Sequence, residues 1–83
     1  MPIYMCERTF ASPLTVDGFG AAGQVLAPCL EARDVKWLAS HLASDGRRSV
    51  CVFEAADAES VREANHTAGL PFDQIWAAQR FVP

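Results

Sequence analysis

The side chains whose types and predicted positions allow metal binding or proton transfer are few in this sequence of 83 residues. They are Cys6, Glu7, His41, Cys51, Glu54, Glu63 and His66. The chain contains none of the spacings HExxH, CxxC and GxSxG, which mark several kinds of metal, redox and hydrolase site. Any chemistry therefore depends on which of these side chains the fold brings together.

His41 is predicted to alternate with Trp37 and Ala39 on one face of a strand. An imidazole binds nickel, zinc or copper and titrates near neutral pH, so His41 is a candidate metal ligand or general base. The simpler interpretation is a histidine packed at a dimer interface. Glu54 is expected at the opposite end of the same hairpin, so His41 and Glu54 can share one ion only across a two-fold axis.

Glu7 and Glu54 are predicted to lie on the two central strands of a sheet. A desolvated carboxylate can act as a proton-transfer group or as a hard metal ligand. The alternative is that these carboxylates pair with Arg8 or Arg80 at the rim of the sheet.

The other candidates have equally plain structural interpretations. Glu63 and His66 are three residues apart on a predicted helix and face the same way. His66 lies off the apolar stripe of that helix, so the simpler interpretation is a solvent-exposed histidine. Cys6 and Cys51 are either small core residues or soft metal ligands, and free cysteine is among the most buried residue types.

The order of elements predicts how these residues are positioned. Alternation, caps and turn residues indicate strand, helix, strand, strand, helix and strand over residues 3–10, 15–30, 35–43, 48–54, 57–69 and 72–82. This βαββαβ order predicts one ferredoxin-like α+β domain over residues 1–83. Its four-stranded antiparallel sheet would carry both helices on one face.

The hairpin at Asp45-Gly46 predicts which residues share a face. A two-residue type I′ turn places Leu38, Ser40 and Leu42 with Ser49, Cys51 and Phe53 under the helices. It places Trp37, Ala39 and His41 with Val50, Val52 and Glu54 on the open face. The open face is apolar enough to need a cover, so we expect a homodimer of the dimeric α+β barrel type. Trp37 and Trp76 are expected to be packing residues or interface anchors.

Composition excludes several classes of function. The net charge of −3 argues against nucleic-acid binding, which needs clustered Lys and Arg. No apolar run approaches about 20 residues and no basic leader is present, so we expect no membrane segment and a cytoplasmic location. Three cysteines are an odd number, which favours reduced thiols over a disulfide framework.

Four stretches together resemble a family of small bacterial proteins that includes a nickel-binding, nickel-responsive protein. They are Glu7-Arg8-Thr9-Phe10, Val35-Lys36-Trp37-Leu38-Ala39-Ser40, Cys51-Val52-Phe53-Glu54-Ala55 with Glu59-Ser60-Val61-Arg62-Glu63-Ala64, and Ala68-Gly69-Leu70-Pro71-Phe72-Asp73. The resemblance implies a ferredoxin-like fold that dimerises through the sheets. It also implies nickel as a cofactor, for which His41, His66, Cys51 and Glu63 are the candidate ligands in this sequence.

A second hypothesis is an enzyme that uses no cofactor. Dimeric α+β barrels of this size can hold a small apolar substrate between the sheet and the helices for isomerase or cyclase chemistry, an expectation from fold analogy. His41, Glu7 or Glu54 would then transfer the proton. Tyr4, Trp37, Phe53 and Trp76 would shape the pocket. A closed cavity holding one of the three proton-transfer candidates would favour this hypothesis, and ligands gathered at a subunit interface would favour metal binding.

Overall fold

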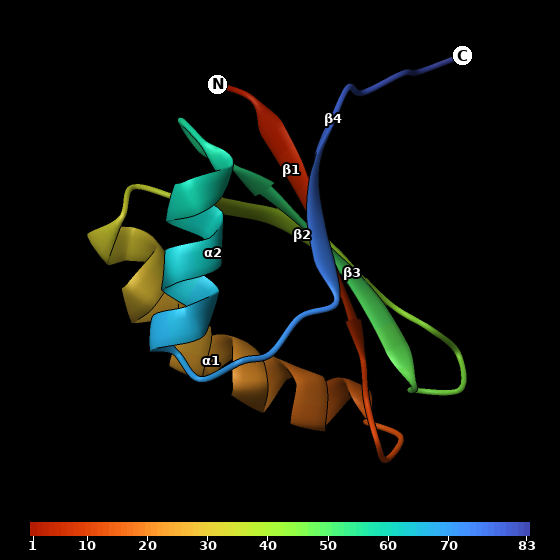
Figure 1. Ribbon diagram of the computed structural model, residues 1–83. Helices are drawn as coiled ribbons and strands as arrows, with labels where there is room; N and C mark the ends of the chain where they lie inside the picture. Colours follow the sequence, from red (N-terminus) through yellow and green to blue (C-terminus); the bar gives the residue numbers. More distant parts are fainter.

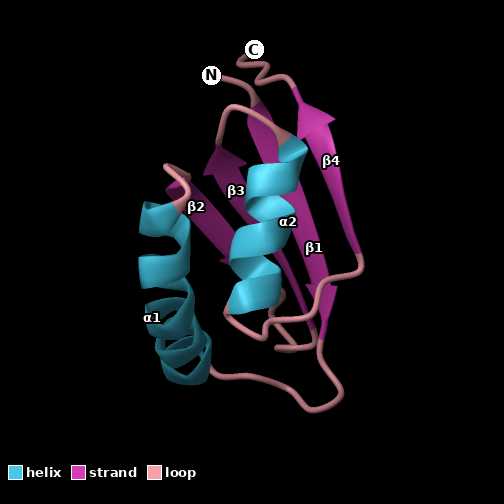
Figure 2. Ribbon diagram, turned by 60° about the vertical axis from the view of Figure 1, so that its left-hand side comes forward, coloured by secondary structure: helices cyan, strands magenta, loops and turns pink.

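The computed structural model describes all residues from Met1 to Pro83 and confirms the predicted order of elements (Figure 1). The elements are β1 (Ile3–Thr9), α1 (Val16–Ala32), β2 (Lys36–Leu42), β3 (Arg48–Glu54), α2 (Ala58–Thr67) and β4 (Gln74–Ala78). The four strands form one antiparallel sheet in the order β2-β3-β1-β4. Both helices cover the same face of that sheet, and the other face is bare (Figure 2). The chain therefore has the ferredoxin-like α+β fold.

The ends of the helices follow the signals in the sequence. Thr15 is the N-cap of α1 and accepts a hydrogen bond from the amide of Gly18 at 3.0 Å. Asp57 caps α2 and accepts from the amide of Ser60 at 2.8 Å. Asp34 takes the left-handed conformation (φ 54°) that usually favours glycine after a helix, and it turns the chain into β2.

The core lies between the sheet and the helices. Alternate residues of the two central strands point into it, and residues from both helices meet them. Its buried apolar members are Tyr4, Cys6, Leu26, Leu30, Val35, Cys51, Phe53, Ala55, Val61 and Ala64.

The predicted register of the hairpin is confirmed from Ala39 to Leu42, but Trp37 and Leu38 were assigned to the wrong faces. A bulge at Leu38 makes Trp37 the partner of Phe53, on the helix side, and the two rings lie 6.1 Å apart. Leu38 is instead 47% exposed and lies beside the open face. The cause is a contact across the layers: Gly23 of α1 leaves room for the Trp37 indole, which comes within 2.5 Å of the position a Cβ would take.

The hairpin turn also differs from the prediction. Gly46 has φ 74°, whereas Asp45 keeps a negative φ, so the turn is not type I′. The amide of Gly46 donates to the carbonyl of Ala43 at 2.8 Å, and the Asp45 carboxylate accepts from the amide of Arg47 at 3.0 Å. A Cβ on Gly46 would lie 2.3 Å from the carbonyl oxygen of Leu14, so this position requires glycine.

The last strand is shorter than predicted. It ends at Ala78, not at Val82, because Ala78 pairs with Ile3, the first residue of β1. The residue before Ile3 is Pro2, which has no amide N–H to continue the ladder. Residues 79–83 therefore leave the sheet, and Phe81 is 85% exposed.

Candidate functional site

One row of side chains crosses the open face of the sheet. The registers place His41 of β2 beside Val50 of β3, Val50 beside Glu7 of β1, and Glu7 beside Gln74 of β4. Neighbouring residues of each strand point into the core, so these four point away from the helices. The open face thus carries an imidazole and a carboxylate in the same row, two strand spacings or roughly 10 Å apart.

The Glu7 carboxylate is held by its neighbours on β4. Its Oε2 atom accepts hydrogen bonds from Nε2 of Gln74 and from Nε1 of Trp76, both at 2.6 Å. Its other oxygen, Oε1, has no hydrogen bond within the chain. The sequence-based pairing of Glu7 with Arg8 or Arg80 is wrong, because Arg8 lies on the opposite face of β1 and no ion pair joins either arginine to Glu7.

His41 is exposed at the edge of this face and its side chain makes no hydrogen bond within the chain. Glu54 lies two rows away on this face, where it is paired with Ile3 on one side and Lys36 on the other. His41 and Glu54 therefore lie at opposite ends of the hairpin, as predicted.

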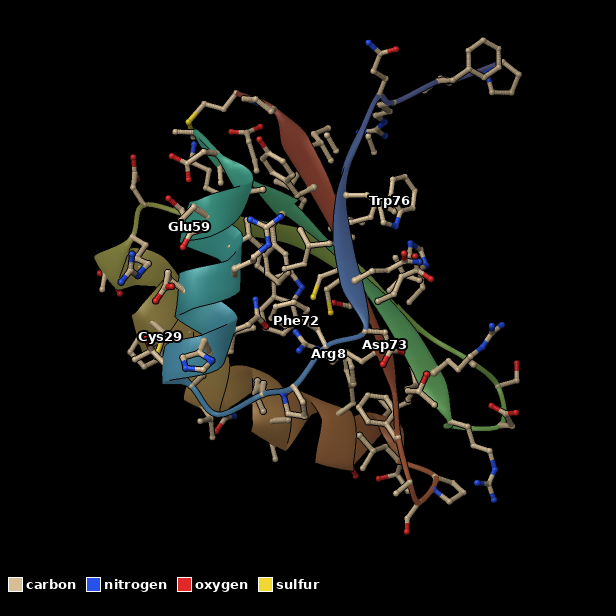
Figure 3. All side chains as sticks on the ribbon, in the orientation of Figure 1. Arg8, Cys29, Glu59, Phe72, Asp73 and Trp76 are labelled. Carbon is tan, nitrogen blue, oxygen red and sulfur yellow. The ribbon has the colours of Figure 1, made fainter.

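An apolar hollow of about 1050 Å³ lies beside this row. Met5, Val52 and Ala39 form its floor, Trp76 and Leu38 its sides, and the segment that follows β4 its end. Figure 3 shows Trp76 on the side of the sheet that faces away from both helices. Trp76 is 44% exposed, an unusual degree of exposure for so large an apolar group.

The four predicted metal ligands lie in different parts of the chain. His41 is on the open face, whereas Cys51 is 1% exposed under the helices. His66 is exposed on α2, and Glu63 of the same helix lies 3.9 Å from Arg33. The chain brings together no group of three or more His, Cys, Asp or Glu side chains that could hold a metal ion.

Cys6 is fully buried next to Cys51 in the β1–β3 ladder. Desolvation raises the pKa of its thiol to about 11, although the Arg8 charge opposes the shift. At neutral pH the thiol is therefore protonated, which makes it a core residue and a poor metal ligand.

A second cavity, of about 250 Å³, lies between the sheet and α1. Trp37, Leu26, Phe19 and Cys51 line it, together with Arg8. None of the three proton-transfer candidates reaches it, because Glu7, His41 and Glu54 all lie on the other face of the sheet. A pocket lies between the sheet and the helices, as the enzyme hypothesis requires, but it is partly open to solvent and lacks the groups that the hypothesis assigned to it. Sequence reasoning missed Arg8, which it had placed at the rim.

Residues 18–23 spell Gly-x-Gly-x-x-Gly, the glycine spacing of dinucleotide-binding turns. In those sites the glycines form the turn between a strand and a helix. Here all three lie within α1, which starts at Val16, and Gly23 packs against Trp37. The spacing therefore forms no dinucleotide-binding turn, and of the three glycines only Gly23 packs against the sheet.

No helix has the length and apolar character needed to cross a membrane. The arrangement of elements and the bare, partly apolar sheet face define a small ferredoxin-like α+β protein with one uncovered sheet face. The family model described as nickel responsive protein SCO4226-like matches residues 4–77, and the chain belongs to this family.

The crystal structure of SCO4226 from Streptomyces coelicolor A3(2) superposes with a TM-score of 0.86 at 19% sequence identity. The match covers 96% of this chain and 99% of that chain, which confirms the ferredoxin-like fold. The comparison with curated proteins gave no match.

Proposed function

We propose that this protein is a homodimer that pairs through the open faces of its sheets and binds a divalent transition metal, nickel, between the two copies. His41 would supply an imidazole ligand and Glu7 a carboxylate ligand. The observation that carries the proposal is that both donors lie in one row of the face that needs a cover. Membership of a nickel-responsive family supports the choice of metal.

The apolar hollow supports pairing of two copies. Its floor and sides consist mainly of Met5, Val52, Leu38 and Trp76, and no helix covers them (Figure 2). Burial of apolar surface contributes about 25 cal/mol per Å², so pairing two such faces is favourable. A two-fold interface places the same patch on both sides, and this patch is self-complementary in polarity.

The number of donors supports a site shared between two copies. One chain offers His41 and Glu7 on this face, fewer than the four to six ligands that a divalent transition metal takes. A two-fold axis doubles the set to two imidazoles and two carboxylates, a nitrogen and oxygen set that suits Ni²⁺. Gln74 and Trp76 already orient the Glu7 carboxylate, as outer hydrogen-bond partners do for metal ligands.

His66 remains the alternative imidazole ligand. It is exposed on α2, three residues after Glu63, so these two could bind a metal at the helix surface. Cys51 is not part of the proposal, because it lies beneath the helices where His41 and His66 do not reach.

Calorimetric titration with nickel, zinc and copper tests the proposal. We expect nickel binding that is weakened at least tenfold by His41→Ala and by Glu7→Gln, and by less than twofold by His66→Ala. Light scattering on each variant controls for the assembly. If His41→Ala binds nickel as well as the unmodified protein, the assigned site is wrong; if His66→Ala alone abolishes binding, the site lies on α2.

A further inference from the structure

Arg8 is a buried cation that has no anionic partner. Its residue is 7% exposed, and its side chain enters the space between the sheet and the helices, where Figure 3 also shows Phe72. The two ion pairs of the chain join Arg33 to Glu63 and Arg62 to Glu59, and neither involves Arg8. A buried charge destabilises the fold unless it is paired, so the groups around Arg8 indicate which compensating group is missing.

The hydrogen bonds of Arg8 go to neutral acceptors. Nη1 donates to the carbonyl oxygens of Pro71 at 3.1 Å and Leu70 at 3.5 Å, and Nη2 donates to Oδ1 of Asn65 at 2.5 Å. The Asn65 amide is oriented by its own bond to the carbonyl of Val61 at 2.8 Å. These bonds tie β1 to the end of α2, but they neutralise none of the charge.

Donors on Arg8 remain free. A guanidinium has five N–H groups, and the bonds above leave Nε–H and one proton of Nη2 without an acceptor in the chain. Asp73, an acid two residues after Pro71, instead accepts from Oγ1 of Thr9 at 2.6 Å. Ser49 lies directly opposite Arg8 in the β1–β3 register, and its hydroxyl is the one buried side-chain polar atom without a hydrogen-bond partner. Arg8 therefore keeps donors free for a further acceptor, next to a buried hydroxyl that also lacks one.

The cavity beside Arg8 is apolar and already formed. Its volume is about 250 Å³, larger than the roughly 150 Å³ apolar cavity that suffices for a benzene ring. Phe10, Phe19, Leu26 and Trp37 are among its walls. The Trp37 ring is fixed by hydrogen bonds from Nε1 to Oγ of Ser40 at 2.6 Å and to the carbonyl of Ala39 at 3.2 Å. A rigid apolar wall with one cationic donor is typical of a small-ligand pocket.

We propose that this cavity binds a small apolar carboxylate, a single ring or short chain whose anionic end pairs with Arg8. The carboxylate would supply the missing negative charge and accept from the free N–H groups, since guanidinium and carboxylate match in geometry. A metal cation is repelled at this place, and a neutral ligand leaves the charge unpaired. The site lies on the opposite face of the sheet from His41 and does not rest on the nickel proposal.

Benzoate is the probe that tests this site, with benzamide as the neutral ligand of the same shape and inorganic phosphate as the anion without an apolar part. The variant Trp76→Phe leaves Trp37, in the cavity wall, as the sole tryptophan. We expect benzoate to change the Trp37 emission saturably, and benzamide to bind at least tenfold more weakly. Equal responses to benzoate and benzamide, or a phosphate response matching that of benzoate, overturn the proposal.

Three further variants, made in the Trp76→Phe background, locate the binding. Arg8→Met should weaken benzoate binding at least tenfold, while Arg48→Met, which changes an exposed arginine at the start of β3, should leave it within twofold. If Arg8→Met fails to fold, Ala22→Leu fills the cavity from α1 and leaves Arg8 in place. Unchanged benzoate affinity in Ala22→Leu places the ligand elsewhere and overturns the proposal.

Discussion

The two faces of the sheet differ in how much of their apolar surface the chain itself buries. On the helix side of β1, Tyr4 and Cys6 are buried in a packed core. On the other side, Met5 and Glu7 line an open surface whose large anchor, Trp76, is 44% exposed. β1 thus has one face that is buried in the core and one face that no other part of the chain covers. The comparison indicates that the covered face contributes most of the stability of the single chain, whereas the open face leaves apolar surface that the chain itself does not bury.

The strongest way to test this contrast is to truncate one residue on each face of β3. Phe53 is 0% exposed under the helices, so Phe53→Ala should lower the free energy of unfolding by about 3–5 kcal/mol. Val52, the next residue, is half-buried on the open face, and Val52→Ala should cost less than about 1.5 kcal/mol. Urea unfolding at low protein concentration measures both. Equal losses would show that the two faces are equally part of the monomer core.

A charge on the open face should separate the subunits without unfolding them. Trp76→Glu is expected to weaken self-association by at least about 100-fold, or about 2.8 kcal/mol, because it replaces the largest apolar side chain of the hollow by a carboxylate. Val25→Glu is the matched control, since Val25 is 54% exposed on the outer side of α1. Sedimentation equilibrium measures the association. A Val25→Glu variant that dissociates as readily as Trp76→Glu would place the interface on the helices.

The closeness of packing on the covered face can be tested at two glycines of α1. Gly23→Ala should lower the free energy of unfolding by about 1–3 kcal/mol, because the new Cβ would meet the Trp37 ring at 2.5 Å. A Cβ at Gly20 would meet no atom within 4 Å, so Gly20→Ala should raise the free energy of unfolding by about 0.5–1 kcal/mol through its higher helix propensity. Thermal unfolding compares them. A stabilised Gly23→Ala variant would show that Trp37 does not rest on this helix.

The smallest expected effect concerns the buried thiol. Burial raises the pKa of Cys6 from 9.0 to about 11, so the folded state holds its proton more tightly than the unfolded state. The resulting stabilisation is complete below about pH 9 and is lost as the pH rises toward 11. Between pH 8 and pH 10.5, Cys6→Ala should therefore lose less stability than the unmodified protein. Urea unfolding at both pH values checks this, and Cys29→Ala should keep the full loss.

Much of the fold could be predicted because its signals are local. Alternation in β1 and β3, the caps Thr15 and Asp57, and the turn at Asp34 all depend on residues close in sequence. The face of Trp37 could not be predicted, because it depends on the space that Gly23 leaves in another layer.

The candidate site could be predicted only in part from the sequence, for the same reason. His41 and Glu54 were correctly placed at opposite ends of one hairpin, which a local register determines. The bonds from Gln74 and Trp76 to Glu7 require the β1–β4 register, which joins strands 67 residues or more apart. The burial of Arg8 depends on Asn65 and on the carbonyls that follow α2, so a strand pattern alone could not indicate it.

The central claim is that the open face pairs two copies and gathers His41 and Glu7 around nickel. Native mass spectrometry of the nickel-treated protein, alongside His41→Ala, tests it most directly because one spectrum reports both assembly and metal content. We predict a species of twice 9.0 kDa that carries nickel, and a His41→Ala dimer of the same size without it. A nickel-loaded species at 9.0 kDa, or a His41→Ala dimer that retains nickel, would contradict the account.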